Sequence, residues 1–139
     1  MQGRSSDAVM LVGRILICLL FIIGGWGKLM APAATQAMLA GHHLPFVGVG
    51  WLLAVAVELG GGLLILVGLF TRPVGFVLAV WCVATALIAH TNLAERAQEI
   101  QFFKNMGLTG GFLYIAVFGA GAWALDALWG KGRGPAAAE

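Results

Sequence analysis

The stretch that decides the fold is residues 9–30, VMLVGRILICLLFIIGGWGKLM, in which only Arg14 and Lys28 carry charge. A helix needs about 20 predominantly apolar residues to cross the hydrocarbon core of a bilayer. This stretch has that length, and Pro32 follows it closely. It is too long for the apolar region of a signal peptide, and no small-residue cleavage site closes it. The sequence therefore predicts a retained membrane-spanning helix.

The composition of the whole chain also fits lipid as its main solvent. Of the 139 residues, 60% are hydrophobic and 10% are charged, and the mean hydropathy is +0.94. A soluble domain usually carries about 25% charged residues, so this chain has too few to cover a water-facing surface. The net charge of +2 and the lack of a basic run exclude nucleic acid as a partner.

The sequence predicts three further helices whose lengths reach or approach that of a membrane span. They run from about Val49 to Phe70, from Val74 to His90 and from Lys104 to Leu125. The polar stretch between the first two helices, residues 31–48, predicts a short helix or loop at the membrane interface. Residues 91–101 predict a loop or surface helix capped by Thr91 or Asn92.

The expected fold class is all-α, an integral membrane four-helix bundle. Residues 9–128 form the transmembrane domain, residues 1–8 a cytoplasmic N-terminal segment and residues 129–139 a flexible C-terminal tail. A shared Gly-Gly-apolar pattern at residues 61–64 and 110–113 leaves open two parallel-related helical hairpins.

Lysine and arginine residues bias the orientation, because short cytoplasmic loops carry an excess of them. Four spans place both termini on the same side as the turn near residue 72. That side holds Arg4, Arg72, Lys131 and Arg133, whereas the other clearly holds only Arg96, with Lys28 and Lys104 at its helix ends. We therefore expect both termini in the cytoplasm.

Polar groups at membrane depth give the strongest functional signal. A charged side chain at mid-bilayer costs at least about 2.5 kcal/mol, so such residues almost always face the protein interior. We predict that these residues line a ligand-binding pocket near the outer face, with Glu58 and His90 as catalytic candidates. The predicted set is Arg14, Lys28, Glu58, His90, Lys104 and Asn105.

The Glu58 carboxylate needs a cation, and the sequence leaves its identity open. Arg14 and Lys28 lie on one stripe of the first helix, respectively deeper and shallower than Glu58 by about 10 Å. Long basic side chains close much of such a gap, so Arg14, Lys28 or both through water are candidates. A structural ion pair that fixes helix register explains Glu58 and Arg14 equally well, and a lysine at a helix end also fits simple interfacial snorkelling.

Resident cofactors have little support in the pattern. A bis-histidine haem needs histidines on facing helices, and only His90 lies in or beside a predicted helix. His42 and His43 are expected in a solvated outer loop, and no zinc-ligand spacing occurs. We expect neither haem nor metal.

Several motifs, taken in order, resemble the DoxX family. They are residues 14–16, 21–28, 58–62, 68–72, His90 and 102–106, and the resemblance covers about residues 9–128. The resemblance implies a bacterial inner-membrane protein with four helices. The family name comes from a subunit of an archaeal thiosulfate:quinone oxidoreductase, and other members are linked with thiol-stress systems as membrane partners of soluble enzymes.

The leading hypothesis is a membrane subunit or accessory of a quinone-linked redox system, with a soluble redox enzyme as partner. Its pocket would take a quinone or another small amphipathic ligand, and whether it catalyses a reaction stays open. One alternative is a small-molecule or lipid binding or transport module without catalysis. Another is a scaffold that recruits soluble partners through residues 91–101 and the tail. Helix-packing glycines also leave a homodimer open.

Overall fold

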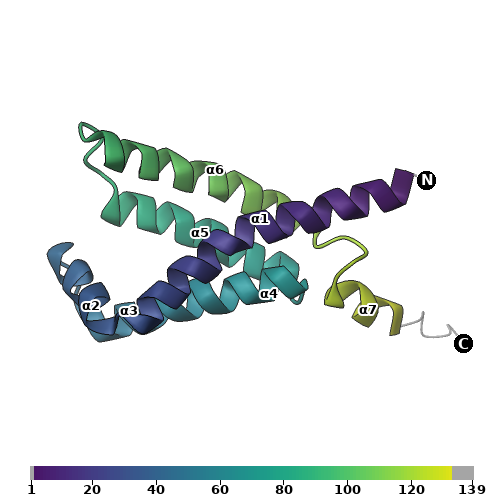
Figure 1. Cartoon of the computed structure of the whole chain (residues 1–139), viewed down its shortest axis with the longest axis horizontal. Coiled ribbons are helices and arrows are strands. Elements are labelled where there is room, and N and C mark those ends of the chain that lie inside the picture. The colour runs from purple at the N-terminus through teal and green to yellow at the C-terminus, as the bar shows by residue number, and fades with distance from the viewer. Residues whose placement is uncertain (1, 133–139) are drawn as a thin grey trace, which may run out of the picture.

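The computed structural model describes residues 2–132, and all of its regular elements in that range are helices (Figure 1). The all-α class is therefore confirmed over the part of the chain that is described. The elements are α1 (Gln2–Met30), α2 (Pro32–Gly41), α3 (Val47–Val55), a π-helical turn η1 (Ala56–Gly60), α4 (Gly61–Val67), α5 (Thr71–Ala89), α6 (Arg96–Phe118) and α7 (Leu125–Gly132).

Within residues 2–132, three stretches are long and apolar enough to cross a membrane: Ser5–Met30, Val47–Val67 and Thr71–Ala89. The second of them runs without interruption through α3, η1 and α4, and α5 follows it after a short turn. These three confirm the first three predicted spans, with ends displaced by a few residues.

The fourth predicted span is not confirmed. α6 has 23 residues, but it begins at Arg96 instead of Lys104, so its first turns are polar. It ends at Phe118 because Gly119 adopts a φ of 79°, which starts an irregular segment over residues 119–124. The four-span bundle therefore remains a prediction.

Other element boundaries also differ from the expectation. α1 begins at Gln2, so residues 2–8 continue the first helix, and α2 supplies the short helix expected between the first two spans. The predicted cap at Thr91 or Asn92 is wrong, because Glu95 is the N-cap residue of α6. The expected flexible tail is helical as far as Gly132, and the rest of it lies outside the described residues.

The helices pack as two antiparallel pairs. α1 lies along α3, η1 and α4, and α5 lies along α6 in the most extensive helix contact. In Figure 1, α1 and α5 run toward the same end of the molecule. α1 and η1 approach to backbone contact, since a Cβ added at Gly25 would lie 2.4 Å from the backbone nitrogen of Leu59. Small residues permit such close approach between membrane helices.

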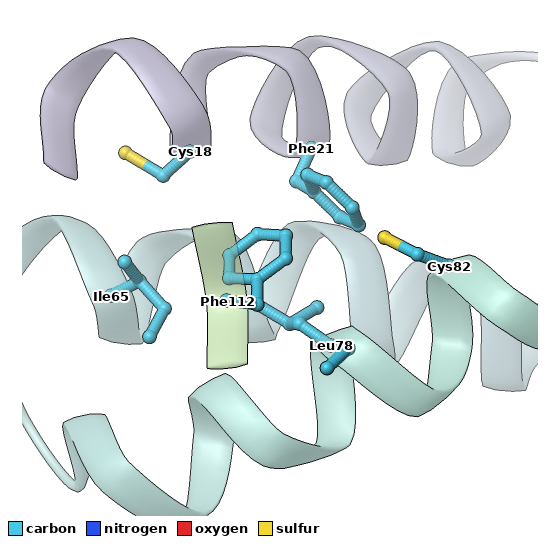
Figure 2. Packing of buried hydrophobic residues seen from close by; sticks show 7 residues of the cluster. Cys18, Phe21, Ile65, Leu78, Cys82 and Phe112 are labelled. Carbon is cyan, nitrogen blue, oxygen red and sulfur yellow. The ribbon is translucent and has the colours of Figure 1, made fainter. Parts of the chain in front are cut away.

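A compact apolar core lies where these helices meet. Side chains of α1, α4, α5 and α6 point into this region (Figure 2), and the rings of Phe21 and Phe112 meet edge to face with centroids 5.0 Å apart. Large side chains on the opposite faces are exposed, as lipid contact requires. The core cluster consists of Cys18, Phe21, Ile65, Leu78, Ala79, Cys82 and Phe112.

The C-terminal helix α7 docks on the turn between α4 and α5. The two Asp126 carboxylate oxygens accept hydrogen bonds from the backbone N–H groups of Phe70 and Thr71, both at 2.8 Å, and from the Thr71 hydroxyl at 2.6 Å. The Asp126 N–H donates to the Gly68 carbonyl at 2.8 Å. Phe70 has a φ of 50°, a rare conformation for a bulky residue that these bonds help to hold. Both ends of the described chain therefore lie at one end of the molecule (Figure 1).

Candidate functional site

A partly buried ion pair joins α1 to η1. The Lys28 Nζ lies 2.6 Å from Glu58 Oε2, and Glu58 is only 8% exposed. Gly24 makes room for the carboxylate, because a Cβ at that position would lie 3.1 Å from Glu58 Oε2. Of the cations that the sequence allows for Glu58, the structure shows Lys28 in direct contact. The burial argument thus identified the acid correctly, and the structure selects its partner.

Two tryptophans that the sequence analysis did not assign to the site complete it. The Trp81 Nε1–H on α5 donates to Glu58 Oε1 at 3.2 Å. The Trp51 Nε1–H on α3 donates to the Lys28 backbone carbonyl at 2.8 Å and so anchors the end of α1. A buried indole N–H usually finds an acceptor, and the Trp residues inside apolar runs were the available signal for these contacts.

Glu58 occupies the centre of the π-helical turn η1, Ala56–Gly60. Such turns are rare inside α-helices and occur frequently at functional sites. By changing the rotation between α3 and α4, the turn sets which face of each helix meets α1. Glu58 also lies well inside the membrane span, roughly 16 Å along the helix from Val47 at about 1.5 Å per residue. A carboxylate at this depth is costly unless it is paired, and Lys28 meets that need.

A cavity of about 240 Å³ adjoins the ion pair. Lys28, Glu58 and Trp81 form part of its wall, His42 and Thr85 also line it, and most of the remaining wall is apolar side chains from α2, α3 and α5. Lysine and indole groups can donate to a ligand oxygen, and a carboxylate can accept from a hydroxyl. The arrangement can therefore hold an oxygen-bearing headgroup against an apolar wall. His42 had been expected in solvent, but its ring is half-buried.

The structure places the other outer candidates elsewhere. The His90 Nδ1 lies 2.7 Å from the Gln98 side-chain oxygen, and Lys104 donates to the side chain of Gln101. Asn105 is buried, and its amide donates to the Gln101 backbone carbonyl at 3.0 Å. None of these three candidates is among the residues that line the cavity beside the ion pair. The early start of α6 supplies the glutamine partners, which the predicted helix boundary had left in a loop.

Arg14 lies at the other end of the bundle. Its guanidinium donates to the carbonyls of Ala120 at 2.7 Å, Trp123 at 2.9 Å and Leu66 at 3.2 Å. Residues 14 and 28 are roughly 21 Å apart along α1, at about 1.5 Å per residue. Arg14 therefore ties α1 to α4 and to the segment after α6, and it does not reach the cavity.

Comparison with known proteins shows the family of the chain. The DoxX family model matches residues 9–91. The chain is 40% identical over 128 residues to the inner membrane protein YqjF of Escherichia coli (strain K12), covering 92% of this chain and 97% of that protein. It is 33% identical over 129 residues to the inner membrane protein YphA of the same organism, covering 89% and 92% respectively. No solved structure matches the chain significantly. The resemblance drawn from the sequence motifs is thus confirmed, and the chain belongs to the DoxX family of inner-membrane proteins.

Proposed function

We propose that this protein binds a small amphipathic molecule, a quinone by headgroup chemistry, in the cavity beside Lys28 and Glu58. In this proposal it acts as a membrane subunit or accessory of a quinone-linked redox system for thiol or sulfur stress, in the bacterial inner membrane. The observation that carries the proposal is a partly buried ion pair in the wall of an otherwise largely apolar cavity. Ligand sites typically combine apolar walls with a few well-placed polar groups.

The ion pair suits a headgroup that alternates between carbonyl and hydroxyl oxygens. The Lys28 ammonium has three N–H donors, and one direct side-chain acceptor is recorded for it, Glu58 Oε2. A remaining N–H can donate to a quinone carbonyl, while the Glu58 carboxylate can accept from a quinol hydroxyl. Reduction of the quinone to the quinol takes two electrons and two protons. In this proposal the soluble redox partner supplies the electrons, and water supplies the protons, which pass to the ring oxygens by way of Glu58.

The size of the cavity supports a headgroup rather than a whole molecule. Its volume of about 240 Å³ lies just below the range of about 300–1,000 Å³ that is usual for drug-sized ligands. A single substituted ring fits such a space, and an apolar tail would remain in the lipid. The Lys and Arg distribution favours cytoplasmic termini, which would place this cavity in the outer half of the membrane.

Tryptophan fluorescence tests the proposal directly, because Trp81 lines the cavity. Purified protein in detergent is titrated with a short-chain ubiquinone, and saturable quenching of the emission gives the dissociation constant. The same titration with the reduced quinol should show binding to Glu58→Gln weakened about tenfold, the scale of one lost hydrogen bond to a charged group. Lys104→Gln is the control, because Lys104 is exposed and outside the cavity. Unchanged quinol binding in Glu58→Gln would contradict the proposal.

A second variant separates loss of binding from loss of folding. Ala84 lines the cavity and contributes no hydrogen-bonding side chain, so Ala84→Leu fills space while leaving the ion pair in place. We expect it to remove saturable quenching while the melting temperature stays close to that of the wild type. Full binding by this variant would exclude the cavity as the quinone site.

The largely apolar wall also favours a second candidate, a binding module without catalysis. In that case the cavity accepts a hydrophobic molecule for its shape, and the ion pair only fixes the helices. The quinone titration is then repeated with an analogue of the same ring and tail that lacks both oxygens. Equal affinity for the two molecules would favour this candidate over the quinone proposal.

A further inference from the structure

Arg14 is a buried cation whose partners are all neutral. It is 4% exposed, and its three recorded hydrogen bonds go to backbone carbonyls of Ala120, Leu66 and Trp123. Its Nε is buried and has no hydrogen-bond partner among the described residues. Carbonyl oxygens satisfy N–H donors, but they do not neutralise a full charge. A buried charge is costly unless it is paired, so this position favours an anion.

The nearby carboxylate of Asp126 does not fill that role by direct contact. Its oxygens accept from Phe70 and Thr71, and no ion pair between Asp126 and Arg14 is recorded in residues 2–132. The two groups attract each other only at longer range. The guanidinium therefore keeps an unused donor and a charge without a contacting counter-ion.

Arg14 also lines a groove of about 600 Å³ between α1 and α6. The wall is almost entirely apolar and includes Ile17 on α1 and Tyr114 and Phe118 on α6. The groove lies close to the ends of the helices, because α6 ends at Phe118 and Arg14 bonds to Leu66, one residue before α4 ends. An occupant with a long apolar chain and an anionic head matches both the wall and the cation at its edge.

We propose that this groove binds an anionic phospholipid, with its phosphate at Arg14 and an acyl chain between α1 and α6. The phosphate oxygens would accept from the guanidinium, a strong charge-assisted contact. The apolar wall explains why the occupant is a lipid rather than free phosphate. The position near the helix ends explains how a headgroup reaches the arginine. This site is separate from the Lys28–Glu58 cavity and does not depend on the function proposed for it.

Replacing Arg14 risks unfolding, because its side chain joins three segments, so the test fills the groove instead. Gly13 lines the groove, and a Cβ built there meets nothing within 4 Å. Gly13→Leu therefore occupies the groove and leaves the bonds of Arg14 intact. Gly27→Leu is the matched control, since Gly27 is on the same helix, is equally free of neighbours and does not line the groove.

The measurement is native mass spectrometry of protein purified in detergent with equal amounts of dioleoyl phosphatidylglycerol and dioleoyl phosphatidylcholine. We expect wild type and Gly27→Leu to retain the anionic lipid about tenfold better than the zwitterionic one, the scale of a charge-assisted hydrogen bond. Gly13→Leu should lose that retention.

Four results would overturn the proposal. They are equal retention of both lipids by wild type, equal behaviour of the two leucine variants, displacement of the lipid by excess inorganic phosphate, and a lipid-free dimer as the dominant species. The third would indicate a site for phosphate alone, and the fourth a groove covered by a second copy of the chain.

Discussion

Replacing Gly25 with alanine should push α1 away from η1. The new Cβ would lie 2.4 Å from the Leu59 nitrogen and 2.8 Å from its Cα and Cβ. Ordinary van der Waals contact begins near 3.4 Å, so the two helices must separate by about 1 Å in an interior with few voids to absorb the shift. Lys28 lies one turn further along α1, and its 2.6 Å contact with Glu58 would lengthen with that movement.

The cost can be isolated with a matched substitution on the same helix. Gly27→Ala introduces a Cβ that meets nothing within 4 Å, so it should be neutral or stabilise by up to about 1 kcal/mol through helix propensity. Gly25→Ala gains the same propensity but adds overpacking, which typically costs about 1–3 kcal/mol. Because the propensity term cancels, the difference between the two variants should be about 1–3 kcal/mol.

Thermal unfolding in detergent, followed by tryptophan fluorescence, measures that difference. We expect Gly25→Ala to melt several degrees below Gly27→Ala and to bind the short-chain quinone more weakly. If the two variants melt at the same temperature, the close approach of α1 and η1 does not hold the bundle together, and the reasoning fails.

Three further predictions concern the ion pair, the C-terminal helix and the core. Lys28→Met should destabilise by about 3 kcal/mol, because it leaves the buried Glu58 carboxylate without its partner. Glu58→Gln should cost less, because the Lys28 side chain is partly exposed. The double variant should cost clearly less than the sum of the two single costs when all three variants are unfolded in parallel. Burial raises the pKa of Asp126, but hydrogen bonds from the start of α5 and the charge of Arg14 outweigh it and hold that pKa below its usual range. Docking of α7 should therefore be complete at pH values above the ordinary pKa of a carboxyl group, and it should weaken as the pH falls through the lowered pKa of Asp126. Hydrogen exchange of α7 should show this pH dependence, and Asp126→Asn should remove it. Phe112→Ala should cost about 3 kcal/mol or more, whereas truncating the lipid-facing Phe76 should change the melting temperature little; similar losses at both positions would place the core elsewhere.

The sequence was sufficient for the features that depend on the bilayer alone. The depth argument identified Glu58 and Arg14 as inward-facing, and both are buried. Three of the four predicted spans correspond to the three segments within residues 2–132 that are long and apolar enough to cross a membrane. The cost of exposing a polar group to hydrocarbon applies to each residue separately, so its effect can be predicted from the sequence alone.

The partners of those groups could not be derived in the same way. Lys28 and Arg14 share one stripe of α1, and only the contact of Gly25 with η1 sets which of them meets the carboxylate. Nothing in the sequence of residues 56–60 distinguishes the π-helical turn from an α-helix. His90 and Lys104 were assigned to the pocket from depth, but the structure pairs them with Gln98 and Gln101 in the first turns of α6. Each of these outcomes depends on the packing of one helix against another.

The apolar core described above has a consequence for the movement of protons across the membrane. The side chains of Phe21, Ile65 and Phe112 form an apolar layer between the guanidinium of Arg14 and the Lys28–Glu58 ion pair. Apart from the thiols of Cys18 and Cys82, every side chain of that cluster is apolar. Under the proposed function, a proton exchanged with a ligand at Glu58 would therefore come from, and return to, the side of the membrane on which the cavity opens.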